Sequence, residues 1–141
     1  WDSARSATPR ISQLAAELGI GERPRSLGYV SSAKLAALYG SAAVLAFPSR
    51  FEGFGLPVVE AMSVGCPVIA ADATALPALV GDGGLLVDPG DVDGWARELA
   101  RVIDDHVVRA KLADAGRARF AELAAADTVD RLVDLYRKAL A

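Results

Sequence analysis

The sequence is poor in several residue types, and each shortage argues against a class of protein. Only one cysteine, Cys66, occurs among the 141 residues, so neither a disulfide framework nor a cluster of thiolate metal ligands can form. The formal net charge of −3 argues against binding to nucleic acid or to an anionic membrane. No apolar run approaches the roughly 18 residues of a membrane span. We therefore expect a globular protein of the cytoplasm.

Apolar residues, by contrast, are plentiful enough for a hydrophobic core. They make up 52% of the chain, and charged residues make up 23%, which is ordinary for a globular domain. A chain of this length fits a single domain. Because it begins with Trp1 instead of methionine, we expect residues 1–141 to be one truncated domain cut from something longer.

Apolar runs alternate with amphipathic stretches along the chain. Pro9 at a first-turn position predicts a helix that ends at Gly19, and the run at 43–47 predicts a strand that is covered on both faces and central in its sheet. Further strands are predicted at 25–30, 68–71 and 84–87. Helices are predicted after Ser31 or Ser32, from Pro57 with Gly65 just past the end, and after an Asp91 cap, with a short helix or turn at 74–81. The rest, 107–140, is predicted to form about two helical segments divided near Asp127. The alternation predicts an α/β fold, with a Rossmann-like parallel sheet, flanking helices and a C-terminal helical tail.

One stretch, PSRFEGFGLPVVEAMSVGCPVIAAD at residues 48–72, combines features of an anion site. Gly53 and Gly55 let the backbone approach a ligand, and a helix that begins near Leu56 offers unpaired N–H groups with a favourable dipole. Open parallel sheets place ligands outside the carboxyl ends of their strands, where this loop must lie. The stretch therefore predicts a phosphate site.

Two glutamates flank this turn, and their carboxylates extend the prediction. A carboxylate accepts two hydrogen bonds at once, so Glu52 and Glu60 each suit a vicinal diol of ribose or of another sugar. An anion site with two diol acceptors describes a nucleotide-sugar site. Purely structural interpretations stay open for both. We expect Glu60 in the first helical turn, where the helix dipole alone favours it, and Ser49 with Glu52 matches a capping box.

The same stretch closely resembles the signature of retaining GT-B glycosyltransferases of family four, in which two glutamates flank seven residues, here EGFGLPVVE. The segments RSLGYVSSAKLAALYGSAAVLAFPS before it and ALPALVGDGGLLVDPGD after it are similar to that family as well, and the resemblance covers roughly residues 9–137. It implies the C-terminal, donor-binding part of a GT-B fold, and transfer of a sugar from a nucleotide-diphosphate sugar to an acceptor hydroxyl with retention.

The resemblance also implies roles for individual residues. Glu60 matches the glutamate that holds the ribose hydroxyls of the donor, and Glu52 matches the catalytic glutamate near the transferred sugar. The remaining donor-binding positions follow the backbone contacts to sugar and diphosphate and the surroundings of the nucleobase: Gly53, Phe54, Gly55 and Leu56 for the former, Tyr29 and Val30 for the latter. No metal ion and no cofactor besides the donor substrate is expected.

The sequence departs from the family pattern in two respects. The N-terminal acceptor domain of the family and the first βα units of the donor domain have no counterpart in these residues, so we expect weak nucleotide binding and no turnover by the chain alone, and self-association through an exposed sheet edge. Ala78 replaces a usual glutamate, which leaves the local hydrogen bonds in question. The alternatives are a non-catalytic scaffold or protein-interaction module and, less favoured, a sugar epimerase.

Overall fold

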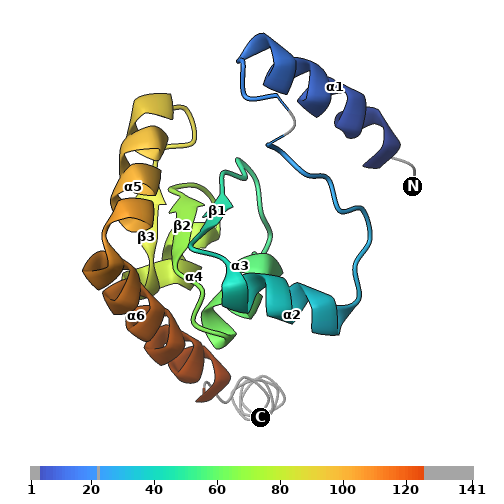
Figure 1. Cartoon of the computed structure of the whole chain (residues 1–141). Coiled ribbons are helices and arrows are strands. Elements are labelled where there is room, and N and C mark those ends of the chain that lie inside the picture. Colours follow the sequence, from blue (N-terminus) through green and yellow to red (C-terminus); the bar gives the residue numbers. More distant parts are fainter. Residues whose placement is uncertain (1–3, 22, 126–141) are drawn as a thin grey trace, which may run out of the picture. The chain divides into compact units, whose positions relative to one another are not determined.

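The computed structural model describes residues 4–21 and 23–125, and the chain divides into two compact units, residues 1–35 and 36–141 (Figure 1). The first unit contains α1, Ala4–Glu17, followed by a turn in which the N–H of Ile20 donates to the Ala15 carbonyl at 3.0 Å. Gly19 has a φ of 67°, which confirms the predicted glycine end. The predicted first-turn position of Pro9 is wrong, because the helix begins five residues earlier and accepts the proline in its interior.

The predicted strand at 25–30 is also wrong. This segment has no strand conformation and takes part in no strand pairing among the described residues. Gly28 lies in its middle with a φ of 59°, and a left-handed residue interrupts the extended backbone that a strand requires. The apolar composition of the segment therefore did not suffice to make it a strand.

The second unit is built on a parallel sheet of three strands, which confirms the predicted fold class. Its strands are β1, Leu45–Phe47, β2, Val68–Ala71, and β3, Leu85–Val87, in the spatial order β1, β2, β3. Ala46 pairs with Ile69, and Ile69 pairs with Leu85. The prediction that 43–47 is central is wrong: β1 lies at an edge of the described sheet and is only partly buried, whereas all four residues of β2 are buried.

Helices connect and follow these strands, as the alternation predicted. The helices are α2, Ser32–Ser41, α3, Leu56–Ser63, α4, Leu76–Val80, the short 3-10 helix η1, Gly81–Gly83, α5, Val92–Asp104, and α6, His106–Ala125. The boundary between the two units falls between residues 35 and 36 of the sequence, within α2. The Asp91 cap is confirmed, since its carboxylate accepts from the Gly94 N–H at 2.9 Å. The predicted division near Asp127 lies outside the described residues.

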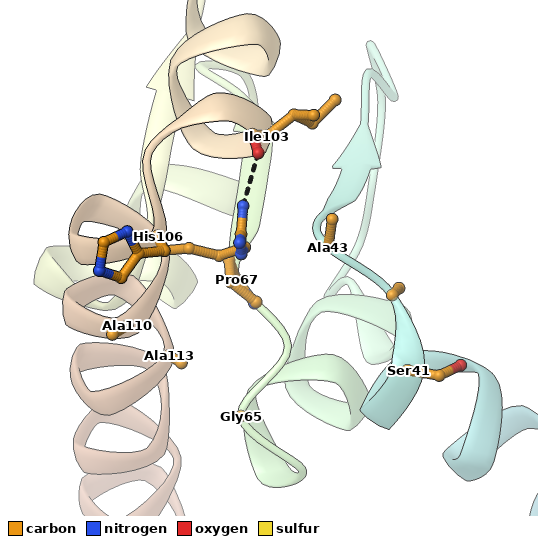
Figure 2. A pocket seen from close by; sticks show the side chains of 10 residues that line it. Ser41, Ala43, Gly65, Pro67, Ile103, His106, Ala110 and Ala113 are labelled. Atoms are coloured by element: carbon orange, nitrogen blue, oxygen red, sulfur yellow. Dashed lines mark hydrogen bonds between the residues drawn. The ribbon is translucent and has the colours of Figure 1, made fainter.

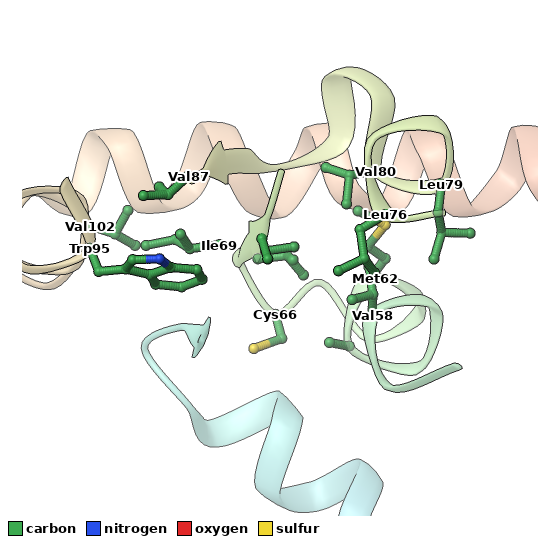
Figure 3. Close-up of a cluster of buried hydrophobic side chains, with 14 residues drawn as sticks. Val58, Met62, Cys66, Ile69, Leu76, Leu79, Val80, Val87, Trp95 and Val102 are labelled. Carbon is green, nitrogen blue, oxygen red and sulfur yellow. The ribbon is translucent and has the colours of Figure 1, made fainter. Parts of the chain in front are cut away.

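The hydrophobic core surrounds β2, the middle strand of the sheet (Figure 3). Met62 from α3, Ile69 from β2 and Leu76 from α4 are its largest fully buried side chains. Trp95 of α5 also packs here, and its indole N–H donates to the Asp88 carbonyl at 3.0 Å, which satisfies its polar group. Burial of a side chain such as Met62, Ile69 or Leu76 contributes about 1.5–3 kcal/mol, so this cluster stabilises the second unit.

A long-range contact from α6 fixes the backbone around Ala78. The guanidinium of Arg119 donates to the carbonyls of Ala78 at 2.7 Å and Leu79 at 3.0 Å, and it pairs with Glu122 at 2.9 Å. The backbone at Ala78 is thus held by an arginine from another helix, although the side chain at this position is apolar. In the described residues, no helix has both the length and the apolar character that a bilayer crossing requires.

Candidate functional site

The loop between β1 and α3 ends at Gly55, in a backbone conformation that favours glycine. Gly55 is the N-cap of α3 and has a φ of 97° and a ψ of 46°, in the left-handed region, and Pro57 follows in the first turn. A Cβ atom on Gly55 would lie 2.8 Å from Cδ2 of Leu76 and 3.0 Å from Cδ2 of Leu79. The loop is therefore seated directly on α4, and the predicted sharp turn into a helix is confirmed.

Four consecutive backbone N–H groups are unpaired at this turn. Within the described part of the chain, the N–H groups of Gly53, Phe54, Gly55 and Leu56 donate to no acceptor, and no side chain caps the helix. Hydrogen bonding inside the helix starts with the N–H of Val58, which donates to the Gly55 carbonyl at 3.0 Å. Unpaired N–H groups at a helix N-terminus, with the positive end of its dipole, form an arrangement that binds phosphate groups.

Glu52 lies just before these N–H groups, with its backbone fixed and its carboxylate free. Its N–H donates to Oγ1 of Thr74 at 3.1 Å, while the half-buried side chain makes no hydrogen bond or ion pair within the described residues. The capping-box interpretation fails, because α3 begins seven residues after Ser49, whose hydroxyl instead donates to the Phe51 carbonyl at 3.4 Å. A free carboxylate beside unpaired N–H groups is available to a ligand.

Glu60 lies one turn further along α3, on the same side of the helix as Leu56. As the fifth residue of α3 it is beyond the first turn, so its predicted first-turn position is wrong and the helix-dipole explanation loses its main basis. Its side chain is exposed and has no hydrogen-bond or ion-pair partner in the described chain. Burial raises the pKa of Tyr39, and the nearby charge of Glu60 raises that pKa further.

The other two predicted donor-binding residues belong to the first unit. Tyr29 is almost fully exposed, and Val30 is partly buried. They are the last two residues of the irregular segment that replaced the expected strand, and they belong to a different unit from the β1–α3 loop. The structure thus brings Glu52, Gly53–Leu56 and Glu60 together on one loop and helix, and the nucleobase contacts stay a prediction.

Sequence reasoning missed Thr74, which the structure places against this loop. It follows β2, and its hydroxyl oxygen accepts the N–H of Glu52 from 22 positions earlier in the chain. Among the described residues other than glycine, it alone has a positive φ, 51°. Nothing in the local sequence distinguishes this threonine, because its partner lies after a neighbouring strand.

A hollow of about 590 Å³ lies at the opposite, amino end of β1 and β2 (Figure 2). Its lining residues precede β1 and β2 or surround the junction of α5 and α6: Ser41, Ala42, Ala43, Gly65, Pro67, Ile103, His106, Arg109, Ala110 and Ala113. Its strongest donor is already engaged, since Nη1 of Arg109 donates to the carbonyls of Val102 at 3.0 Å and Ile103 at 2.6 Å. Unlike the β1–α3 loop, this hollow has no carboxylate among its described lining residues.

Comparison with known proteins gives a consistent family. A sequence model described as "Glycosyl transferases group 1" matches residues 7–119. The MMP alpha-(1->4)-mannosyltransferase of Mycolicibacterium hassiacum is 42% identical over 133 residues, which cover 92% of this chain and 32% of that protein. The chain spans about a third of the length of the curated relatives it matches.

Solved structures agree with the sequence comparison. HepE from Anabaena, solved with UDP and glucose, superposes with a TM-score of 0.83 and 25% identity, covering 99% of this chain and 38% of that one. The C-terminal domain of a group 1 glycosyl transferase from Francisella tularensis gives a TM-score of 0.74 and 27% identity, covering 86% and 64%. The parallel sheet with flanking helices is therefore that of a GT-B C-terminal domain.

Proposed function

Because the chain belongs to the group 1 glycosyl transferases, we propose that it binds the donor in an enzyme that transfers a sugar from a nucleotide-diphosphate sugar to an acceptor hydroxyl with retention. The observation that carries this proposal is the cluster at the carboxyl end of β1: four unpaired N–H groups between two carboxylates without hydrogen-bond or ion-pair partners in the described chain. HepE was solved with UDP and glucose, which supports a donor of this class.

Each group in this cluster has a distinct task in the proposal. The N–H groups of Gly53–Leu56 bind the diphosphate and stabilise its negative charge as the sugar leaves. Glu60 accepts hydrogen bonds from the ribose hydroxyls, and Glu52 lies near the transferred sugar and acts in catalysis. Tyr29 and Val30 lie near the nucleobase. The proposal assigns no step to a metal ion.

The acceptor site belongs to the part of the relatives that this chain does not span. Two or three hydrogen bonds to charged groups at about 1.5–3 kcal/mol each, less an association cost of at least ~4 kcal/mol, leave a dissociation constant at best in the millimolar range. We therefore expect weak nucleotide binding and no sugar transfer by residues 1–141 alone. The cytoplasmic location and self-association through the outer edge of β1 remain predictions.

The test is a titration of the isotope-labelled chain, followed by NMR, with uridine, guanosine and adenosine diphosphates and their sugar conjugates. We expect at least one nucleotide to shift the amide signals of Gly53–Leu56. Glu60→Ala should weaken that binding about tenfold or more, because a carboxylate that accepts two hydroxyl protons is lost. Its stability should change little, since the side chain is exposed and has no hydrogen-bond partner among the described residues.

A matched control separates the role of this carboxylate from that of net charge. Asp104→Ala removes an exposed acidic group from the end of α5, at the other end of the sheet, and should leave the titration unchanged. Equal signals from the unmodified chain and from Glu60→Ala would contradict the proposal and favour a non-catalytic scaffold. Transfer of radiolabelled sugar by this polypeptide alone would overturn the expected dependence on the remaining part of the enzyme.

A further inference from the structure

We propose that Thr74 is a positioning residue, which holds Glu52 in the place where that carboxylate meets the transferred sugar. The inference rests on the proposed function and adds to it a residue after a different strand. Its starting point is a backbone outlier: Thr74 has a φ of 51°, and no other described residue except glycines has a positive φ. A β-branched side chain disfavours this region strongly, so an interaction must hold the residue there.

The local turn shows why the position is unusual for threonine. The Leu76 N–H donates to the Ala73 carbonyl at 3.1 Å, and Ala75 has a φ of −81° and a ψ of −15°. Thr74 is thus the first central residue of a tight turn, at which a positive φ favours glycine or asparagine. A glycine here would relieve the strain but would provide no side chain.

The threonine side chain reaches the candidate site through a single hydrogen bond. Oγ1 of Thr74 accepts from the Glu52 N–H at 3.1 Å, which joins the loop after β1 to the loop after β2. Since β1 and β2 are parallel neighbours, both loops lie at the carboxyl edge of the sheet. The hydroxyl therefore links the site to the next strand of the rigid sheet.

A second contact holds the other end of the same loop segment. Three residues after Glu52, Gly55 packs against Leu76 and Leu79 of α4, so the loop is held at both ends of the segment that carries the free N–H groups. Catalytic groups must be held within about 0.5 Å of their productive positions, and a group on a loop depends on such supports. Without the threonine bond, only the Gly55 end would remain attached.

The test compares three substitutions at this position. Thr74→Val keeps the branched shape and the strain but removes the acceptor, Thr74→Ser keeps the hydroxyl, and Thr74→Gly removes both strain and hydroxyl. Hydrogen exchange of the Glu52 amide, measured by NMR, should become about tenfold faster in Thr74→Val, because one hydrogen bond is lost, and should stay near its original rate in Thr74→Ser. Thr74→Gly serves in place of Thr74→Val if that variant does not fold.

A second measurement distinguishes a positioning role from a purely structural one: the ratio of the dissociation constants of a nucleoside diphosphate and its sugar conjugate. Uridine diphosphate is compared with uridine diphosphate glucose, and guanosine diphosphate with guanosine diphosphate mannose, by titration of the labelled chain. Thr74→Val should weaken binding of the sugar conjugate about threefold to tenfold and leave the nucleoside diphosphate unchanged, because the contact of Gly55 with α4 still holds the phosphate-binding N–H groups. Thr74→Ser should restore the original ratio.

The outcomes separate this inference from the proposal on which it rests. An unchanged Glu52 exchange rate, or an equal loss for diphosphate and sugar conjugate, overturns the role of Thr74 while the nucleotide site stands. Absence of any nucleotide binding by the unmodified chain overturns the proposed function itself, and the inference with it.

Discussion

The two ends of the parallel sheet differ in which hydrogen-bonding groups lack a partner. At the amino ends of β1 and β2 lies a hollow of about 590 Å³, lined largely by alanines, in which the Arg109 guanidinium already binds two carbonyls at the end of α5. At the carboxyl end lies a loop with four unpaired N–H groups and two carboxylates without hydrogen-bond partners in the described residues. The comparison teaches that the hollow is not where the carboxylates and unpaired N–H groups gather, and the proposed donor site rests on those groups.

The largest expected effect comes from the carboxyl end and concerns stability as well as binding. Gly55→Ala places a methyl group 2.8 Å from Leu76 and 3.0 Å from Leu79 in a left-handed residue. Overpacking costs about 1–3 kcal/mol, and the left-handed backbone adds about 1–2 kcal/mol. We expect a loss of about 3 kcal/mol in the free energy of unfolding, measured by urea denaturation, together with loss of the nucleotide-induced shifts.

The neighbouring glycine provides the control. A Cβ on Gly53 would meet no atom within 4 Å, so Gly53→Ala should change the free energy of unfolding by no more than about 0.5 kcal/mol. If the two variants were equally stable, the close seating of the loop on α4 would be wrong.

An intermediate effect is expected at the amino end, on stability alone. Arg109→Ala removes the donor to the carbonyls of Val102 and Ile103, and should lower the free energy of unfolding by about 1.5 kcal/mol. Lys111→Ala, an exposed neighbour on α6, should cost less than about 0.5 kcal/mol. Nucleotide titration should be the same for both variants, and a weaker affinity in Arg109→Ala would break the distinction between the two ends.

The smallest expected effect is a dependence of the free energy of unfolding on pH, which begins only in the alkaline range. Burial raises the pKa of Cys66, which lies between two residues of the amino-end hollow, above its usual 9.0. Above pH 9 the thiol ionises in the unfolded chain before it does so in the folded one, so stability should fall as the pH rises, by less than about 1.4 kcal/mol per pH unit. Urea denaturation between pH 8 and 10.5 should give a shallower decline for Cys66→Ala, and identical slopes would contradict a buried thiol.

Much of the second unit was predictable from short apolar runs and from helix boundary signals. Residues 68–71 form a buried strand, Asp91 caps α5, and Pro57 stands at the start of α3, because each depends on neighbours in the sequence. The strand expected at 25–30 failed, since a strand also requires a partner and an uninterrupted extended backbone, and Gly28 has a φ of 59°. The predicted central position of β1 was wrong for a related reason, because the local sequence of a strand does not show which strands pair with it.

The residue types of the candidate site followed from the sequence alone: a glycine-containing turn, a helix that starts after it, and two glutamates eight positions apart. What only the tertiary structure decided is that the carboxylates of these glutamates stay without hydrogen-bond partners in the described chain, and that Thr74 and α4 hold the loop between them. The physical reason is distance along the chain. Turn and helix propensities act over a few residues, whereas the contacts that fix this loop join segments about 20 residues apart, which meet only when β1 and β2 lie side by side.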